Sequence, residues 1–442
     1  MKQYSKKIIA LFLAILMVAM AGCTPTSSDS DSDYTYDANA TGELSGTFEL
    51  QIFTGGYGSE VWEEIIADFE EAYPELDVVA YLDSNVNKQM QPRWIQGNPP
   101  DFVYLAGSNI PTLTYMDEGK LLDLTSFLEQ ATVYDSDDLL KDRIKSDMLS
   151  TYKDATYRLP IALSAYGMWY DQVYMEENGL TMPTNFDEFK TFVETTKAKG
   201  LDTIIYPGTS SHYLTSGLIF PALAAYGQEF FDSIVTADSV DAFKDPRFLD
   251  VMTRFEEIAK LGAYSEGTVS LNHIQSQIQW LNHKAVLIPN GLWLENEMKS
   301  DIPEGFQMRY NPGVMQNTDQ EQTIVVTTSN IGVASDGDNK EAALEFIRFM
   351  YQDKYMKRFA QVTGSPVATD VDLSDTELSE SAIYAQTVMN DEKYTIVHEQ
   401  LLWGSVDAVF HDCVNQIVLG DMTAQQAVDT IVEAVERKIA GL

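Results

Sequence analysis

The stretch NHIQSQIQWLNHKAVLIPNGLWLENEM, residues 272–298, contains a helix pattern, a strand pattern and a turn within one short segment. Apolar residues recur at helical spacing over 274–281, and a continuous apolar run occupies 285–288. The run ends at Pro-Asn-Gly, residues 289–291, which is typical of a turn. A second helical pattern begins beside Trp293. The segment therefore predicts a helix leading into a buried strand, whose carboxyl end releases the chain into a loop.

Three side chains near this loop are candidate ligand contacts: Trp293, Asn290 and Glu295. Ligands of open α/β sheets bind beyond the carboxyl ends of the strands, which is where Trp293 is expected to lie. An indole beside an amide and a carboxylate suits a flat guest that is rich in hydroxyl groups. We therefore predict that Trp293 stacks on a sugar ring.

The same stretch carries a family resemblance. A helix ending in an aromatic residue, then Lys284-Ala285 and an apolar strand, then Gly291-x-Trp293, resembles the signature of extracellular solute-binding proteins of carbohydrate ABC transporters. The string 276–298 is especially similar to the branch that binds N-acetylglucosamine and diacetylchitobiose. The resemblance implies an α/β, two-lobed fold of the type II periplasmic-binding-protein kind, with a ligand cleft between the lobes and a helical carboxyl terminus.

The first 42 residues are predicted to be a targeting and tethering segment. Lysines precede an apolar run over 8–20, which is shorter than the about 20 residues that a membrane span needs, so 1–22 is typical of a signal peptide. Ala-Gly-Cys at 21–23 resembles a bacterial lipobox, in which Cys23 receives a lipid; the alternative is an ordinary secretory signal with an incidental cysteine. The polar stretch that completes 23–42 is predicted to be a disordered linker.

Composition limits the partners. The formal charge of −38 becomes −41 once the three lysines of the signal are removed, and such a surface repels nucleic acid and anionic lipid. The chain has 2 cysteines, Cys23 and Cys413, so no disulfide remains if Cys23 is lipidated. About 400 residues exceed what one hydrophobic core serves, so two lobes are expected.

The folded body opens with an alternating strand over 47–53 and a glycine-rich loop that contains Tyr57. The loop lacks the Lys and Ser/Thr of a phosphate-binding loop, so Tyr57 is its candidate for function, with an exposed loop aromatic as the alternative. A β-α-β-α-β pattern continues to the strand 102–105 and predicts a parallel sheet. Asn109 follows that strand and is a cleft candidate; the alternative is a helix cap.

The central run YRLPIALSAYGMWYD, 157–171, is extended and has no helical period. In the resembled family the matching strand crosses between the lobes. Ser164 and Tyr166 alternate onto one face of this strand, so we place them toward the cleft and expect Trp169 and Tyr170 to pack.

His212 and Tyr213 follow the strand 204–206, where the resembled family often places a ligand contact; the alternative is a packing pair at a helix start. Trp280 lies within a helix pattern and is assigned to the core. The strands expected over 306–310, 323–328 and 331–334 return the chain to the first lobe, and 375–442 is expected to be helical.

Trp403 is expected to open one of these last helices, and it faces either the cleft or the core. The resulting lobe boundaries are residues 43–162 with 322–370 for lobe 1 and 163–321 with 371–442 for lobe 2.

The predicted function is that of the substrate-binding lipoprotein of an ABC importer. It captures a mono- or oligosaccharide by lobe closure and delivers it to the permease subunits, as a monomer held by its lipid on the extracellular face of a Gram-positive membrane. The predicted ligand contacts are Trp293, Tyr57, Asn109, Ser164, Tyr166, His212, Tyr213, Asn290, Glu295 and Trp403. We expect no cofactor, no metal, no catalytic residue and no nucleic acid partner.

Two other classes remain open. The chain has no Gly-x-Ser-x-Gly elbow, no His-Glu-x-x-His, and five histidines without close metal-ligand spacing, which argues against an enzyme. A glycoside hydrolase needs only two facing carboxylates, and the chain has 67 acidic residues, so the sequence does not exclude this enzyme class. A binding protein for a peptide or polyamine on the same fold is the third class, although aromatic residues at strand ends favour sugars.

Overall fold

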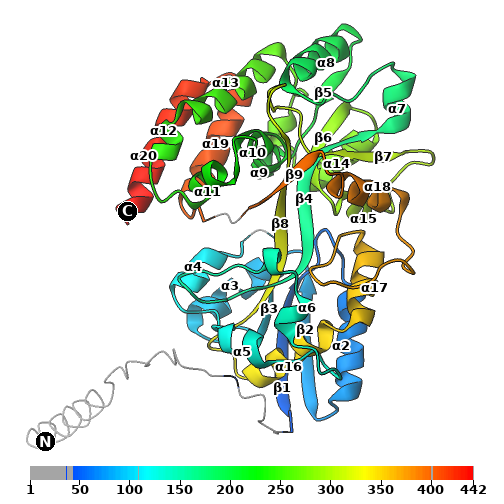
Figure 1. Ribbon diagram of the computed structural model, residues 1–442, viewed down its shortest axis with the longest axis vertical. Coiled ribbons are helices and arrows are strands. Elements are labelled where there is room, and N and C mark those ends of the chain that lie inside the picture. Colours follow the sequence, from blue (N-terminus) through cyan, green and yellow to red (C-terminus); the bar gives the residue numbers. More distant parts are fainter. Residues whose placement is uncertain (1–35, 37–42, 108, 400–401, 442) are drawn as a thin grey trace, which may run out of the picture. The chain divides into compact units, whose positions relative to one another are not determined.

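The computed structural model (Figure 1) describes residues 36, 43–107, 109–399 and 402–441. Residues Tyr36–Leu442 form one compact unit. The predicted signal peptide 1–22, the lipid-accepting Cys23 and nearly all of the linker 23–42 lie outside the described residues. Within the described part of the chain, no helix combines the length and apolar character that crossing a membrane requires.

Three parallel strands begin the sheet of the first lobe, which we call lobe 1. β1 (Gly46–Phe53) lies between β2 (Leu76–Asp83) and β3 (Phe102–Leu105) and pairs in parallel with both. Helices α2 (Glu60–Ala72) and α3 (Val86–Gln96) make the two connections. The parallel sheet predicted from the β-α-β-α-β pattern is therefore confirmed.

Two long strands carry the chain between the lobes. β4 (Leu159–Asp171) and β8 (Gln322–Val333) pair antiparallel over residues 159–165 of β4. In lobe 1, β8 also pairs with β3, whereas the second half of β4 pairs with strands of the other lobe. Figure 1 shows this ribbon running along the length of the folded unit. The extended run predicted over 157–171 is thus a hinge strand.

The second lobe, lobe 2, is built around the far half of β4. β6 (Ala285–Gly291) and β7 (Met308–Asn311) pair antiparallel with β4, and β5 (Asp202–Ile204) adds in parallel to β6. β6 is buried along its whole length, as the apolar run of the sequence predicts. Its carboxyl end faces the junction of the lobes, so the residues that follow it are well placed for a site.

Helices cover the sheets of both lobes. In lobe 1 they are α2, α3, α4 (Thr112–Asp117), α5 (Thr125–Gln130), α6 (Leu140–Arg143), η1 (Ser146–Met148), α16 (Lys340–Met350) and α17 (Asp353–Thr363). In lobe 2 they are α7 (Gln172–Glu177), α8 (Phe186–Ala198), η2 (Gly208–Ser210), α9 (His212–Leu214), η3 (Thr215–Ile219), α10 (Phe220–Ala224), α11 (Gln228–Thr236), α12 (Asp241–Lys244), α13 (Pro246–Leu261), η4 (Thr268–Ser270), α14 (His273–Leu281), α15 (Leu294–Met298), α18 (Glu380–Met389), α19 (Val406–Leu419) and α20 (Ala424–Ile439).

Large aromatic side chains fill the cores because their burial removes the most apolar area from water. Trp62 and Phe69 on one face of α2 are buried in lobe 1, as the helical spacing predicts. Trp169 and Trp280 are each 1% exposed in lobe 2, which confirms that both are core residues. The indole N–H of Trp169 donates to the carbonyl of Asn290, so this core side chain also fixes the end of β6.

Two expectations about secondary structure are wrong. The two strands expected over 323–328 and 331–334 are one continuous strand, β8, because Ser329 and Asn330 stay paired with β4 across the gap. The segment 375–442 is not wholly helical, because β9 (Tyr394–His398) pairs in parallel with β8. The residues YTIVH of β9 are rich in the β-branched and aromatic types that favour strands.

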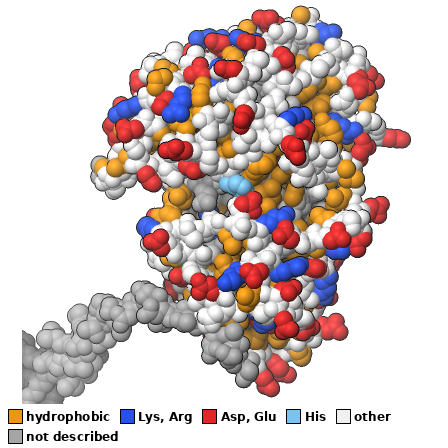
Figure 2. All heavy atoms as spheres, in the orientation of Figure 1, with side chains coloured by type: hydrophobic (Ala, Val, Ile, Leu, Met, Phe, Trp, Pro, Cys, Tyr) orange, Lys and Arg blue, Asp and Glu red, His pale blue; other side chains and the backbone are white. Residues whose placement is uncertain are grey.

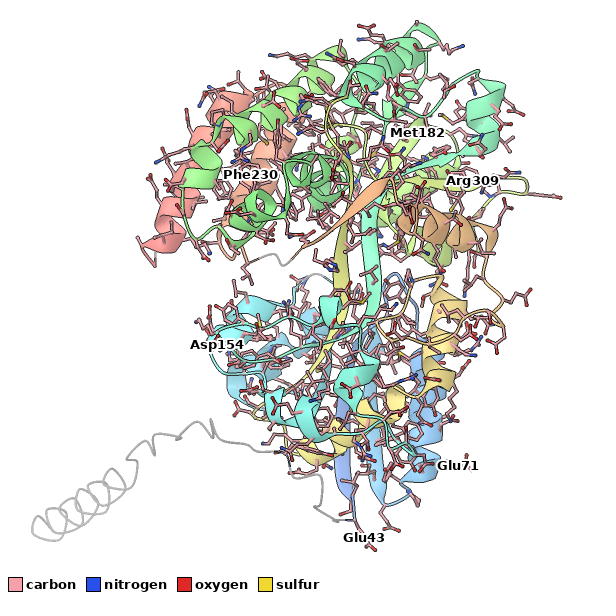
Figure 3. All side chains as sticks on the ribbon, in the orientation of Figure 1. Glu43, Glu71, Asp154, Met182, Phe230 and Arg309 are labelled. Atoms are coloured by element: carbon pink, nitrogen blue, oxygen red, sulfur yellow. The ribbon has the colours of Figure 1, made fainter. Side chains whose placement is uncertain are left out.

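The side chains labelled in Figure 3 mark the two lobes: Glu43, Glu71 and Asp154 lie in lobe 1, and Met182, Phe230 and Arg309 lie in lobe 2. The residue boundaries predicted for the lobes, 43–162 with 322–370 and 163–321 with 371–442, stay a prediction.

Candidate binding site

An aromatic cluster surrounds Trp293 where the two lobes meet. Trp293 follows β6 and precedes α15, and its indole packs closely against Gly291: a Cβ atom on Gly291 would stand 2.4 Å from indole atoms Cη2 and Cζ3. The ring of Tyr166 stands perpendicular to the indole at 5.2 Å between centroids. Tyr166 pairs with Gly291 across β4 and β6, so strand register brings the two aromatic side chains together.

Two further rings complete the aromatic cluster, which we define as Trp293, Tyr57, Tyr166 and Tyr213. Tyr213 on α9 lies 6.3 Å from the indole and 5.7 Å from Tyr166. Tyr57 reaches the indole from lobe 1, at 6.3 Å and nearly perpendicular. These four residues are separate predictions of the sequence analysis, and the structure places the three tyrosines around the indole of Trp293.

Lobe 1 meets lobe 2 directly beside this cluster. The Asn296 amide on α15 donates to the carbonyl of Gly56 at 2.8 Å, and Lys299 lies 3.8 Å from Glu60 of α2. Gly56 has a φ of 73°, and a Cβ there would stand 3.2 Å from Cγ of Trp293, so the loop approaches the indole closely. Figure 2 shows the surface hollowed between the lobes, with a histidine and an acidic side chain at the mouth of the hollow.

His212 lies beside the cluster, with its ring 4.4 Å from Tyr213 and 6.3 Å from Tyr166. Burial, followed by the nearby His411, lowers the pKa of His212 to about 3 against the opposing effect of Asp407. The ring is therefore neutral at pH 7 and offers one donor and one acceptor. A neutral imidazole suits hydrogen bonding to hydroxyl groups.

A second set of contacts fixes the position of α15. Nε2 of His273 lies 2.6 Å from the Glu297 carboxylate, and the Gln277 amide donates to the same carboxylate at 2.7 Å. The ring of Tyr213 stacks on His273 at 4.9 Å. Glu297 therefore ties the helix that follows Trp293 to α14 and to the aromatic cluster, and sequence spacing alone indicates none of these contacts.

The other predicted site residues lie in different surroundings. Ser164 is buried on β4 next to Tyr57. Asn109 is exposed in the loop after β3 with a φ of 63°. Asn290 is fully buried and its side-chain oxygen accepts from the N–H of Gly291. The Glu295 carboxylate accepts a hydrogen bond from Ser379, the residue before α18.

Trp403 belongs to the core of lobe 2. It is 1% exposed, packs on Phe220 and Phe410 at 5.4 and 4.5 Å, and its indole N–H donates to the carbonyl of Ile234 at 2.6 Å. It also precedes α19 by a short turn instead of opening it. With its ring packed and its only donor satisfied, Trp403 has no surface to offer a ligand, and we leave it out of the site.

Glu399 is a candidate site residue that sequence reasoning missed. It directly follows β9, and its backbone N–H donates to Val326 of β8 at 2.8 Å, which places it at the junction of the lobes. Burial raises the pKa of Glu399 to about 8, and the Asp407 carboxylate adds to that rise. Its Oε2 atom has no hydrogen-bond partner among the residues described. The strand-favouring sequence YTIVH of β9 is the signal that could have indicated this residue.

Replacing Glu399 by glutamine is expected to stabilise the protein at high pH. The pKa of Glu399 is about 8 in the folded protein and 4.5 ordinarily. Between these two pH values the folded protein holds a proton that the unfolded chain has released, so the free energy of unfolding falls as the pH rises from about 4.5 to about 8. The Tm of Glu399→Gln should exceed that of the parent by roughly 2–4 °C at about pH 8.5, and by less at about pH 5. Melting followed by circular dichroism checks this; the exposed Glu304→Gln is the control. An equal Tm difference at both pH values contradicts the assignment.

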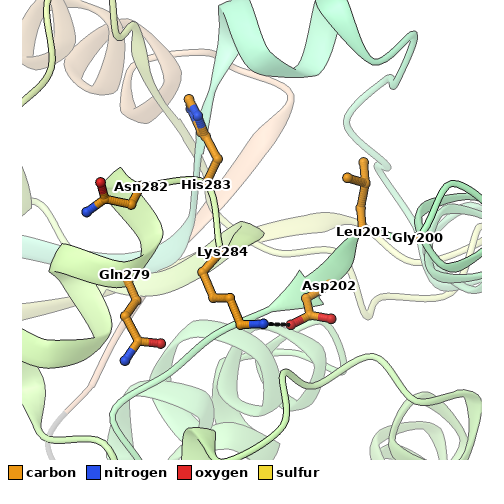
Figure 4. Close-up of a pocket in the computed structure, with 7 residues that line it drawn as sticks. All are labelled: Gly200, Leu201, Asp202, Gln279, Asn282, His283 and Lys284. Carbon is orange, nitrogen blue, oxygen red and sulfur yellow. Dashed lines mark ion pairs between the residues drawn. The ribbon is translucent and has the colours of Figure 1, made fainter.

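A surface pocket also lies away from the aromatic cluster. A pocket of about 590 Å³ opens at the amino-terminal ends of β5 and β6 (Figure 4), which lie roughly 20 Å along the strand from Trp293. Its described lining contains no Trp, Tyr or Phe. Its charged residues Lys284 and Asp202 form an ion pair with each other at 3.3 Å. Ligands of open sheets bind at the opposite strand ends, so the aromatic cluster is the better candidate site.

Comparisons with known proteins identify the family and the fold. Residues 55–357 match the family model described as bacterial extracellular solute-binding protein. The chain is 27% identical to the diacetylchitobiose binding protein NgcE of Streptomyces coelicolor over 391 residues, which cover 84% of this chain and 81% of that protein. Among solved structures, RafE in complex with raffinose gives a TM-score of 0.71 at 20% identity, covering 89% of this chain and 100% of that one. A chitin oligosaccharide binding protein gives 0.73 at 18%, covering 90% and 100%. These structural likenesses show the fold.

Proposed function

Because the chain belongs to the family of bacterial extracellular solute-binding proteins, we propose that it captures a sugar or oligosaccharide between its lobes and delivers it to the permease of an ABC importer. The observation that carries the proposal is the aromatic cluster around Trp293, which draws on both lobes at the carboxyl end of β6. Aromatic faces bind the C–H faces of pyranose rings, and neutral polar groups beside them bind the hydroxyl groups.

The proposed contacts divide by chemistry. Trp293, Tyr57, Tyr166 and Tyr213 supply aromatic surface, and the neutral His212 supplies a donor and an acceptor. We add Ser164, Asn109 and Glu399 as polar contacts. Asn290 has its side-chain oxygen bonded to Gly291 and can offer a ligand only its Nδ2 donor, and Glu295 ranks lower because its carboxylate is bonded to Ser379.

The sugar that we propose first is of the N-acetylglucosamine or diacetylchitobiose type. The support is the similarity to NgcE, whose printed name is diacetylchitobiose binding protein, and the resemblance of the string 276–298 to the same branch. The Nδ2 donor of Asn290 and the Glu399 carboxyl near Tyr166 are the groups that we expect to serve an acetamido group.

Capture works through lobe closure in this proposal. A saccharide that contacts both lobes binds the closed form better than the open one and shifts the population toward closure. The contacts between Asn296 and Gly56 and between Lys299 and Glu60 join the lobes on the same side as the aromatic cluster. Closure then presents surfaces of both lobes together to the permease.

Location outside the cell follows the family, and we propose further that a lipid on Cys23 anchors the chain to the extracellular face of a Gram-positive membrane. The support is the apolar run over 8–20 that ends in Ala-Gly-Cys, and the polar linker that follows it. This arrangement leaves the folded unit free to turn while it stays close to the permease.

The function is tested by melting the protein with a panel of sugars. Diacetylchitobiose, N-acetylglucosamine and raffinose are the candidates, cellobiose is the matched dimer without acetamido groups, and spermidine represents a cationic solute. A bound sugar at about 100 times its Kd adds about 2.7 kcal/mol of stability, so the Tm is expected to rise by roughly 3 °C.

Chromatography of the same mixtures should return the sugar unchanged. Hydrolysis of any sugar would contradict a binding role and favour a glycoside hydrolase. A Tm that responds to spermidine and to none of the sugars would contradict the saccharide assignment.

A further inference from the structure

Hydroxyl groups from four separate segments gather at the inner end of the aromatic cluster. Tyr57 comes from the loop after β1, Ser164 from β4, Ser329 from β8 and Ser365 from the turn after α17. The three serine hydroxyls lie beside the Tyr57 hydroxyl, where each lowers its pKa against the larger rise that burial causes. We call Tyr57, Ser164, Ser329 and Ser365 the hydroxyl cluster.

Three of these hydroxyl groups are buried without a partner. Tyr57, Ser164 and Ser365 are 5%, 1% and 0% exposed. Among the described residues, no group is placed to form a hydrogen bond with their hydroxyl oxygen atoms. A buried hydroxyl that makes no hydrogen bond costs folding free energy. The serine hydroxyls are close enough to Tyr57 to lower its pKa, but these oxygen atoms are not placed to hydrogen-bond one another, so a hydroxyl group of a ligand set among them could bond several of them at once.

Strand register shows that this site is continuous with the aromatic cluster. Ser164 and Tyr166 lie two residues apart on β4 and share a face, and Ser329 pairs with Ala162 on the same face of the ribbon. Tyr57 belongs to both sets, because its ring contacts Trp293 while its hydroxyl points among the serines. A pyranose stacked on the aromatic cluster can therefore extend a substituent into the hydroxyl cluster.

The hydroxyl cluster is uncharged. The side chains that lower the Tyr57 pKa are three serines, which carry no charge. The Glu399 carboxyl, which acts on the neighbouring Tyr166, has a pKa raised to about 8 and is therefore mostly protonated at pH 7. A carboxylate or an ammonium group in this position would be buried without a counter-charge, which is strongly unfavourable. A hydroxyl or hydroxymethyl group can donate and accept there without that penalty.

We propose that the hydroxyl cluster is the subsite that receives a neutral hydroxyl or hydroxymethyl group at one end of the bound saccharide, and that it excludes saccharides charged at that end. The inference rests on the proposed function and adds the chemical class of the sugar terminus. It also assigns to Ser329 and Ser365 a role in selectivity.

The test compares Tyr57→Phe, Ser164→Ala and Ser365→Ala with the parent. Isothermal titration calorimetry with diacetylchitobiose, or with the panel sugar that stabilises the parent most, measures Kd, and melting without sugar measures stability. Each variant should weaken binding about tenfold while leaving the Tm of the free protein unchanged or raised, because the deleted hydroxyl satisfies no partner in the free protein. Tyr351→Phe is the matched control: that hydroxyl donates to the Pro160 carbonyl at 2.6 Å, so its loss should lower the Tm and leave Kd unchanged.

A second measurement uses the parent alone. A disaccharide whose terminal hydroxymethyl group is oxidised to a carboxylate should bind at least about a hundredfold more weakly than the neutral disaccharide. The inference is overturned if the two sugars bind equally. It is also overturned if the hydroxyl variants keep the parent's Kd, whether or not their Tm falls. In those cases the parent still binds sugar and the proposed function stands. A parent that binds no sugar of the panel overturns the proposed function as well.

Discussion

Replacing Trp293 by alanine is expected to raise the Kd for saccharide at least about thirty-fold, the effect of losing an interface residue worth about 2 kcal/mol. The indole is the centre of the aromatic cluster, in contact with Tyr57, Tyr166 and Tyr213, and it joins the two lobes. Its removal takes away the stacking surface and a contact across the cleft. Titration calorimetry with the panel sugar that stabilises the parent most measures the change.

Trp280→Phe is the matched control for this experiment. Trp280 lies in the same sequence stretch, but it is 1% exposed and its indole N–H points to the carbonyl of Val286 in the core. The control should lower the Tm and leave Kd as in the parent. If Trp293→Ala binds saccharide as tightly as the parent, the central assignment of the site is wrong.

The second large effect is expected from a single methyl group. Gly291→Ala places a Cβ atom 2.4 Å from the six-membered ring of Trp293, which is far closer than van der Waals contact allows, so the indole must move. Gly291 lies in a strand, where alanine is sterically acceptable for the backbone. We expect Kd to rise about tenfold or more, with a modest fall in Tm, because the binding surface is displaced while the strand is kept.

A double-mutant cycle separates this mechanism from general damage. Once Trp293 is alanine, a methyl group at residue 291 has no indole to displace, so Gly291→Ala should cause no further loss of affinity in that background. Affinity losses that simply add in the double variant would show that Gly291 acts on binding by a route other than the indole.

Much of the fold could be predicted because it depends on local patterns. The apolar run 285–288, the alternation after Gly46 and the unbroken extended run 157–171 each correspond to a real strand. The convergence of Tyr57, Tyr166, Tyr213 and Trp293 was also accessible, since each follows or lies on a strand whose direction the α/β pattern sets.

The remainder depends on contacts between distant parts of the chain. Trp403 is a core residue because Ile234, 169 positions earlier, accepts its N–H. Glu295 binds Ser379, 84 positions later, and no local spacing indicates that pair. Burial raises the pKa of Glu399 and Asp407 adds to the rise, and Glu399 holds this position because β9, which it follows, pairs with β8.

The order in which the chain passes between the lobes has a consequence for its synthesis. Lobe 2 begins with β4 and β6, but its core also contains Phe410 of α19 and Ile431 of α20, which follow the return through lobe 1. Until those last two helices emerge, the nascent chain exposes the apolar surface that they cover. The core of lobe 2 is therefore incomplete in a chain that ends before residue 406, and we expect such a chain to expose apolar surface and to aggregate.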